Sequence, residues 1–328
     1  MPEAVAVRDA SELGAELVPV KPLPPPVAAQ RSSPEAAQVA VPQSLSPMAR
    51  VLQRVRGGEL LLPSVPTVVS EVRKLVTRPD SAIDDLVSLI ERDQRMALDV
   101  LRLSNTPEFA RRHGRNNDLK IAVQRIGFRR IAALVETICL RGLLQVPDPG
   151  FRQLLLNVWR HSLAKAVSMR AVAELVGFGE KLDADVAYLG GLLADIGASF
   201  LLWLLAERVT GGGRTMDPAS LMVLQEHHEE IGAMVLERWS IGAEVTRIAR
   251  THHAGSPAAR FDPCWNAVMV ATELADDLAP NADITCAARA PRSQVDACLS
   301  ELGLPRTAIE GVAERLRSEY VAILATLA

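Results

Sequence analysis

One apolar segment constrains the fold of this chain more than any other. It runs from Tyr188 to Glu207, YLGGLLADIGASFLLWLLAE, and its first seventeen residues hold a single charge, Asp195. A lone ionised carboxylate costs several kcal/mol to bury unless a cation, a metal ion or a group of hydrogen-bond donors faces it. The fold must therefore bring such a group to Asp195 from another part of the chain.

The same segment is long enough to be tested as a membrane span, which needs about 20 apolar residues. Asp195 at its centre would cost roughly 3 kcal/mol on insertion scales. Gly190, Gly191 and Gly197 interrupt the segment, and no second span is present to shelter the carboxylate. We therefore expect a pair of buried core helices and no contact with a membrane.

The composition favours a helical protein and a cytoplasmic location. Of the 328 residues, 48% are hydrophobic and only 4% aromatic, which argues against a β-sandwich or barrel. The net charge of −3 makes nucleic acid an unlikely partner. No basic stretch followed by an apolar core opens the chain, so we expect no signal peptide and a cytoplasmic protein. The four cysteines, all far apart, read as reduced thiols: Cys139, Cys264, Cys286 and Cys298.

Proline content separates a tail from the rest of the chain. Residues 1–47 hold nine of the 21 prolines, a composition that cannot build a packed core. We expect a disordered tail there; the alternative is a docking segment for a partner that recognises proline. A Pro-Asp-Pro-Gly sequence at 147–150 predicts a boundary between two helical parts, 48–150 and 151–328.

Apolar residues recur at helical spacing throughout both parts, and no alternation typical of strands recurs. The predicted fold class is therefore all-α. In the second part the pattern predicts helices at 154–176, 184–196, 198–209, 217–239, 241–253, 262–279, 291–302 and 305–327.

Five of the six histidines fall within about ninety residues of the second part, with Asp195 among them: His161, His227, His228, His252 and His253. Imidazole and carboxylate together make a good ligand set for Zn, Mn, Fe or Ni. A single histidine is more often a core or surface residue than a ligand. Their occurrence on helices that can converge makes the group a candidate site.

The order of these residues resembles the HD-domain superfamily of metal-dependent phosphohydrolases: His161, then Asp195-Ile-Gly, then His228-x-x-Ile-Gly, then His252-His253. The first part narrows the resemblance to the HDOD domain, a bacterial signalling relative of the HD-GYP proteins that hydrolyse cyclic-di-GMP. The stretches that carry it are LPSVPTVVSEVRKLV, LVSLIERDQRMALDVLRLSNTPEF, LKIAVQRIGFRRIAALV, VWRHSLAKAVSMRAVAEL, AYLGGLLADIGASFLL and IGAMVLERWSI. They span roughly Leu60 to Ala279 and imply an N-terminal helical subdomain packed on an HD-like helical subdomain.

The departures from the superfamily's pattern concern its metal ligands. The His-Asp dyad reads Ala194-Asp195, the late aspartate is Thr272, and an acidic position before the first histidine is Asn157. Only His161 and Asp195 remain of the four ligands that the resemblance implies. A catalytic metal normally has at least three protein ligands and a water. We therefore expect no catalytic residue, no metal and no cofactor.

Five positions are then vestiges of a metal site: His161, Asp195, His228, His252 and His253. We expect Asp195 to accept charge-assisted hydrogen bonds from His161, His252 or His253. Asp276 and Asp277 follow Thr272 by one turn and should face differently, by about 40 to 140 degrees. The alternative is that His228, His252 and His253 still hold an ion with Asp195, which would leave a phosphohydrolase with unusual ligands.

The resemblance implies a regulatory module that acts through protein contacts, with two-component or cyclic-di-GMP-related proteins as partners. A second candidate surface is basic, with one acid among its cations: Arg111, Arg112, Arg115, Lys120, Arg125, Arg129 and Arg130. It could bind an anionic partner. The alternative is a solvated loop whose arginine stems cover apolar surface.

Overall fold

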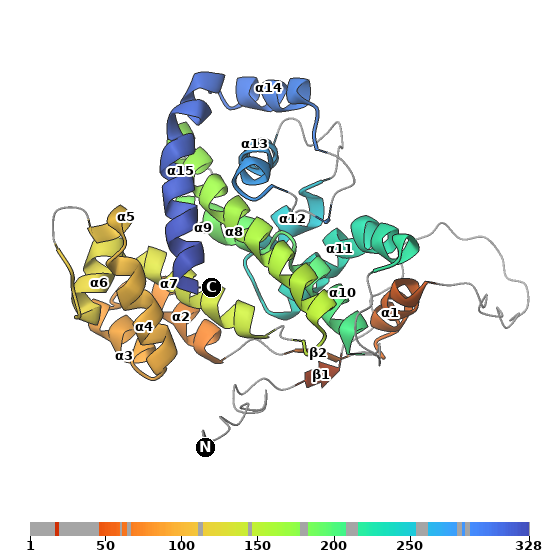
Figure 1. Cartoon of the computed structure of the whole chain (residues 1–328), viewed down its shortest axis with the longest axis horizontal. Helices are drawn as coiled ribbons and strands as arrows, with labels where there is room; N and C mark the ends of the chain where they lie inside the picture. The colour runs from red at the N-terminus through yellow and green to blue at the C-terminus, as the bar shows by residue number, and fades with distance from the viewer. Residues whose placement is uncertain are drawn as a thin grey trace, which may run out of the picture.

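The computed structural model describes residues 17–19, 46–59, 61–63, 67–110, 114–143, 146–177, 183–207, 216–253, 262–280, 284–285 and 289–327. It is built of helices, as the periodicity predicts (Figure 1). The first part holds α1 (Pro47–Arg56), α2 (Thr67–Thr77), α3 (Ile83–Ile90), α4 (Gln94–Ser104), α5 (Pro107–Ala110), α6 (Leu119–Ile126) and α7 (Phe128–Leu143). The second part holds α8 (Pro149–Val176), α9 (Ala184–Leu193), α10 (Ile196–Ala206), α11 (Pro218–Arg238), α12 (Ala243–Thr251), α13 (Pro263–Leu278), α14 (Arg292–Glu301) and α15 (Arg306–Leu327).

Two strands of three residues each accompany the helices. β1 (Leu17–Pro19) pairs antiparallel with β2 (Leu61–Pro63). β1 lies within residues 1–47, where we expected a disordered tail; residues 1–16 and 20–45 lie outside the described residues, so the disorder of the tail stays a prediction. The all-α class is confirmed, because these strands form no layer of the core.

Aspartates and prolines set the start of several helices. Asp148, Asp217 and Asp262 each accept a hydrogen bond from a backbone N–H of the first turn, and a proline follows each of them. An acidic N-cap satisfies an otherwise unpaired amide, and proline at the first helical position has no amide to satisfy. The predicted break at 147–150 is therefore also the start of α8.

Helix α8 is the central element of the fold (Figure 1). Its 28 residues contact α9, α10, α13 and α15, and every residue from His161 to Ala173 is buried. Such a helix is normally apolar all round. This one also carries polar side chains into the interior, among them His161, Lys165 and Arg170, and each of them needs a partner there.

The hydrophobic core has two clusters that meet at α8. One unites α2–α7 with α8, α13, α14 and α15; the other unites α1 with α10, α11, α12 and the first turns of α8. Helix α1 packs on α10 and α11 through Met48, Val51, Leu52 and Val55. Helix α15 runs along α8 and reaches α4 and α5, so elements from both ends of the chain join the two parts.

The apolar segment that carries Asp195 folds as α9 and α10, with Ala194 and Asp195 at the break between them. Residues Ala184–Ala206 are long and apolar enough to cross a membrane by length and composition, but 83% of the most apolar window is buried in this fold. Packing in the protein interior accounts for that apolarity, as the expected core helix pair requires.

Two glycines let these helices approach their neighbours closely. A Cβ at Gly191 would lie 2.7 Å from the carbonyl of Lys165, where α9 crosses α8. A Cβ at Gly197 would lie 2.0 Å from the carbonyl oxygen of His228 and 2.4 Å from the amide nitrogen of Gly232. Helices α10 and α11 therefore cross where the two Ile-Gly motifs of the sequence lie.

Candidate functional site

Lys165 is the group that meets Asp195. Its Nζ lies 3.1 Å from Oδ1 and 3.0 Å from Oδ2 of the carboxylate, and both side chains are 1% exposed. Lys165 follows His161 by four residues, so both project from the same face of α8 toward Asp195. We did not predict that this lysine contacts Asp195. The His-x-x-x-Lys spacing, in a chain with a lone buried acid, was the sequence signal that could have indicated it.

Three further side chains complete the surroundings of Asp195. His161 Nδ1 lies 3.3 Å from Oδ2, while His252 Nε2 and Thr285 Oγ1 lie 2.9 and 3.3 Å from Oδ1. Burial by itself raises the pKa of Asp195, but the charge of Lys165 and the hydrogen bonds from His161 and His252 outweigh it and hold that pKa well below its ordinary value. Asp195 is therefore an ionised carboxylate with its charge compensated inside the protein.

His161 bridges two carboxylates. Its Nδ1 faces Asp195, and its Nε2 lies 3.2 Å from Oδ1 of Asp276 on α13. Only an imidazolium can donate from both nitrogens. Burial and the charge of Lys165 lower the pKa of His161, but the hydrogen bonds to the two carboxylates prevail and raise it.

Asp276 corrects one expectation. We expected it to face differently from Thr272, but it is buried and reaches His161, while the hydroxyl of Thr272 donates to the carbonyl of Val268 in its own helix. Four residues along an α-helix turn by only about 40 degrees. That offset lies within the reach of a carboxylate, so α13 still supplies an acid to this site, one turn further on.

Three histidine rings lie edge-on or tilted to one another beside Asp195. The ring centroids of His228, His252 and His253 lie 4.2 to 5.2 Å apart. His161 and His252 supply the hydrogen bonds that we expected on Asp195, while Nε2 of His253 lies 3.3 Å from Thr285 Oγ1, which in turn reaches the carboxylate. Burial, with the nearby His252, lowers the pKa of His253 and lowers that of His228 to about 4.

Backbone carbonyls fix the orientation of two of these rings. Nδ1 of His228 lies 3.0 Å from the Gln225 carbonyl, and Nδ1 of His252 lies 3.1 Å from that of Ala249. Each Nδ1 therefore donates, which leaves the neutral His228 with a lone pair on Nε2. That nitrogen lies 3.2 Å from Nε2 of His252, which in turn lies 2.9 Å from Oδ1 of Asp195.

These groups also form a set of donors that could hold a metal ion. One donor atom from each of Asp195, His228, His252 and His253 lies within 4.8 Å of all the others. The set meets the ligand types of a Zn, Mn or Fe site, and the carbonyls behind His228 and His252 are the outer partners that such ligands usually have. The ammonium of Lys165 competes with any such ion, because it already contacts both oxygens of Asp195.

The other predicted positions lie outside this cluster. His227 points away from it on α11, toward Arg56 and Glu230. The Asn157 side chain accepts a hydrogen bond from Gln153 on its own helix, and Ala194 is buried as an apolar contact. The structure thus joins His161, Asp195, His228, His252 and His253 in one place, and Asp276, Lys165 and Thr285 join them.

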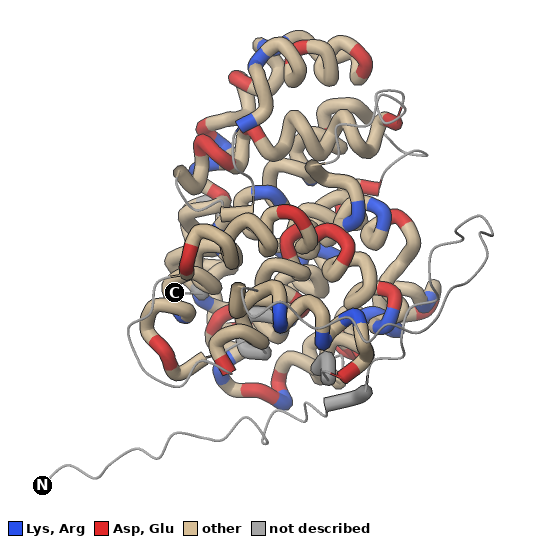
Figure 2. Tube along the Cα trace, turned by 90° about the vertical axis from the view of Figure 1, so that its right-hand side faces the viewer, with Lys and Arg blue, Asp and Glu red and all other residues tan. Residues whose placement is uncertain are grey.

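The basic patch is largely paired with acids. Lys120 donates to Asp84, Arg129 to Asp183 and Arg130 to Glu319. Arg125 donates to the carbonyl of Gly114, and Arg111 and Arg112 lie outside the described residues. In Figure 2, too, acidic residues lie among the basic ones along the chain trace. Binding of an anionic partner by this patch stays a prediction.

A family model for the HDOD domain matches residues 62–255. The chain belongs to the HDOD domain family. The match begins at β2 and ends just after His253, so it contains every histidine of the cluster but leaves out Asp276 and α13–α15. The resemblance found in the sequence motifs is confirmed.

One curated relative of this HDOD protein is an uncharacterized protein of Treponema pallidum (strain Nichols), 27% identical over 199 residues. Those residues are 58% of this chain and 37% of the relative, so the chain spans well under half of the length of that protein. The relative shows the domain and assigns it no activity.

Solved structures share the fold at low identity. An HDOD domain protein of unknown function from Geobacter sulfurreducens is 20% identical, with a TM-score of 0.62 over 84% of this chain and 97% of that one. A protein named "Putative metal-dependent phosphohydrolase" from Shewanella amazonensis SB2B is 19% identical, with a TM-score of 0.64 over 86% and 98% of the two chains. A "Putative signal transduction protein" from Marinobacter aquaeolei VT8 is 22% identical, with a TM-score of 0.57 over 81% and 59%. At these identities the likeness concerns the fold alone.

Proposed function

We propose that this HDOD protein is a cytoplasmic, non-catalytic regulatory module that acts through contacts with signalling proteins. The observation that carries the proposal is the ammonium of Lys165 on both oxygens of Asp195. A phosphohydrolase of the HD type needs that carboxylate as a metal ligand. Here its charge is compensated by the chain itself, and Ala194 and Thr272 stand where two further ligands would be.

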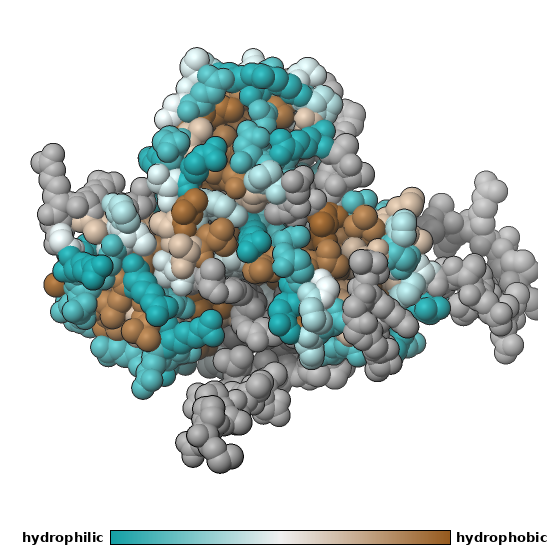
Figure 3. Space-filling model, viewed as in Figure 1, coloured by the Kyte–Doolittle hydropathy of each residue, from teal (hydrophilic) through white to brown (hydrophobic). Residues whose placement is uncertain are grey.

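The surface around α4, α6 and α15 offers places for protein contacts. Three of the large hydrophobic side chains that are exposed among the described residues lie on neighbouring helices: Leu98 on α4, Ile121 on α6 and Val321 on α15. The view in Figure 3 shows hydrophobic areas bordered by hydrophilic residues in the region where Figure 1 places α3, α4 and α6. Exposed apolar areas with polar rims are typical of interaction sites. Two-component or cyclic-di-GMP-related proteins are the partner class that we propose.

The first experiment measures metal content and hydrolysis together. The purified full chain is assayed for bound Mn, Fe and Zn, and then for cleavage of cyclic-di-GMP and of a generic phosphodiester with each metal added. We expect less than stoichiometric metal and no cleavage above a Asp195→Asn variant. Stoichiometric metal, with cleavage that is lost in His161→Ala, would contradict the proposal.

The second experiment addresses the partners. The full chain and a chain without residues 1–47 are crosslinked in cells and the captured proteins are identified. We expect a reproducible signalling protein whose capture falls in a Leu98→Asp, Ile121→Asp double variant, while Met222→Asp, an exposed hydrophobic on α11, serves as the control. Equal capture by both variants would contradict a contact through α4 and α6.

A metal-dependent phosphohydrolase is the second candidate, favoured by the convergence of Asp195, His228, His252 and His253. These four residues would hold the ion, which would supply an activated water when bound. If they do, removal of the competing ammonium in Lys165→Met should tighten binding of Co²⁺, followed by its visible absorption. Under the regulatory proposal this variant gains an ion-binding site that the natural chain lacks, and hydrolysis stays absent.

A further inference from the structure

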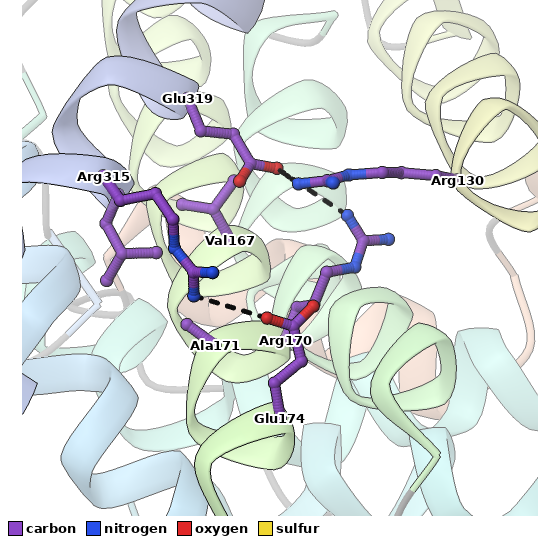
Figure 4. Close-up of a pocket in the computed structure, with 8 residues that line it drawn as sticks. Arg130, Val167, Arg170, Ala171, Glu174, Arg315 and Glu319 are labelled. Atoms are coloured by element: carbon purple, nitrogen blue, oxygen red, sulfur yellow. Dashed lines mark hydrogen bonds and ion pairs between the residues drawn. The ribbon is translucent and has the colours of Figure 1, made fainter. Parts of the chain in front are cut away.

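A polar cavity lies where α7, α8 and α15 meet, away from the histidine cluster. It measures about 70 Å³ and its charged lining comes from all three helices: Arg130 from α7, Arg170 and Glu174 from α8, Arg315 and Glu319 from α15. Figure 4 shows the guanidinium groups of the three arginines and the two carboxylates turned toward one another around this space. A cavity of this size has room for several waters or for one small ion.

The lining of the cavity holds more guanidinium groups than carboxylates. Three guanidinium groups face two carboxylates across it, and the carboxylate that pairs with the third, Asp185, lies outside the lining. Arg170 is 4% exposed, so its charge is held inside the protein and is poorly screened by solvent. Its remaining contacts are Asp185, 3.2 Å away, and the ring of Tyr188, which its guanidinium covers at 4.1 Å.

The hydrogen-bond acceptors around the cavity are also too few. Arg130 Nη2 donates to Oε1 of Glu319, and Arg170 Nη1 lies 3.8 Å from that same oxygen, beyond hydrogen-bond range. Nε of Arg130 is buried and has no hydrogen-bond partner among the described residues. A guanidinium carries five donors and no acceptor. The space between the three arginines therefore favours an occupant that is rich in hydrogen-bond acceptors.

We propose that this cavity binds a small oxyanion of the phosphate class. Guanidinium groups match the oxygens of phosphate in charge and geometry, and three arginines from three helices surround it here. Glu174 and Glu319 oppose the anion, so binding is weak unless Arg315 turns from Glu174 toward it. Arg315 is half exposed and its Nη2 lies 3.3 Å from Glu174, so this turn breaks only a surface ion pair.

The bound anion would tie α15 to α7 and α8. Because α15 also contacts α4 and α5, the anion would strengthen the joint between the first part and the central helix. A ligand that binds only the folded state raises its stability, and the gain grows with the logarithm of the ligand concentration once that exceeds the dissociation constant. This inference concerns a site separate from Asp195, so it stands or falls independently of the proposed function.

The test is a titration of the full chain with sodium phosphate at constant pH and ionic strength, balanced with sodium chloride. We expect the midpoint of thermal unfolding to rise with phosphate concentration and less with acetate, and the isotherm in titration calorimetry to saturate at one site. Arg315→Gln should abolish the rise. Arg317→Gln is the matched control, because Arg317 lies two residues away on the same helix, is 60% exposed and is not part of the cavity lining.

A further arm uses a phosphomonoester, glycerol phosphate, in place of inorganic phosphate. Stronger binding of the monoester would identify the ligand as the phosphate group of a small metabolite, and weaker binding would identify free phosphate. Hydrogen exchange of α15 amides should slow on binding. The proposal is overturned if phosphate raises the unfolding midpoint no more than sodium chloride does, or if Arg315→Gln and Arg317→Gln respond alike.

Discussion

Lys165 and Asp195 form a fully buried ion pair in the interior of this HDOD protein. Both side chains are 1% exposed, and two histidines and a threonine hydroxyl add hydrogen bonds to the same carboxylate. Removal of one partner from a buried ion pair leaves the other charge uncompensated, whereas an exposed pair contributes little. The chain contains a lysine of each kind, so this difference can be measured directly.

We predict that Lys165→Met lowers the free energy of unfolding by about 3–5 kcal/mol. Lys120→Met is the matched control: Lys120 is 49% exposed, pairs with Asp84, and its loss should cost at most about 1 kcal/mol. Urea unfolding followed by circular dichroism measures both. Equal losses in the two variants would show that the buried pair contributes no more than a surface pair.

We predict that stability falls as the pH is lowered from about 6.5 to 4, because of His228. Burial lowers its pKa to about 4 in the folded state, below the value of about 6.5 in the unfolded chain. The unfolded state therefore binds the extra proton in this window, which costs about 3 kcal/mol of stability at its lower end. Urea unfolding at a series of pH values gives the slope, which should decrease in His228→Gln and persist in His227→Gln.

Two other groups of the cluster act in different pH windows. The pKa of Asp195 is depressed, so its stabilisation is present above about pH 3.9 and is lost only as the pH falls toward the folded value. The pKa of His161 is raised, so its stabilisation is complete below about pH 6.5 and is lost as the pH rises through the folded value. A stability profile that is flat between pH 4 and 6.5 would contradict the assignment of a neutral His228.

At the scale of elements, the crossing of α10 and α11 is a tight backbone contact. We predict that Gly197→Ala destabilises the protein by 1–3 kcal/mol or more, because the added methyl meets the carbonyl of His228 and the amide of Gly232. Gly311→Ala is the control, since Gly311 lies in α15 with nothing within 4 Å of its Cβ position. There the substitution should stabilise by about 0.5–1 kcal/mol, because alanine favours the helix. Thermal unfolding gives both signs, and a neutral Gly197→Ala would refute the close contact.

Much of the helical pattern follows from the sequence, because helix periodicity, N-cap aspartates and prolines are local signals. The break at Asp195 follows from its place in an apolar segment. The partner of Asp195 does not, because it depends on how α8 crosses α9, which Gly191 permits. The contact of Asp276 with His161 was missed for a similar reason. The direction of Asp276 on α13 was inferred from the helical angle alone, and a side chain can reach across an offset of about 40 degrees.

At the scale of the whole molecule, the structural unit extends beyond the part that matches the HDOD model. α13, which carries Asp276, and α15, which packs on α8, both lie after residue 255. The core cluster of the first part includes Ile309, Leu316 and Tyr320 of α15. A chain that ends at the family boundary would expose this apolar surface and leave His161 without one of its two carboxylates.

We therefore predict that a fragment of residues 62–255 does not fold cooperatively, whereas residues 46–328 do. Thermal unfolding by circular dichroism and the dispersion of amide signals in NMR spectra distinguish the two. A cooperative transition in the shorter fragment, at the temperature of the longer one, would show that α13–α15 are dispensable for the fold.

The buried Lys165 has a consequence for how the protein folds. The positive charge opposite Asp195 is synthesised with the polypeptide, so the interior is complete as soon as the chain has folded. Under the regulatory proposal, assembly would then be indifferent to iron or manganese starvation and to chelators. A regulatory protein with such an interior could respond to its partners without also responding to the concentration of metal ions in the cell.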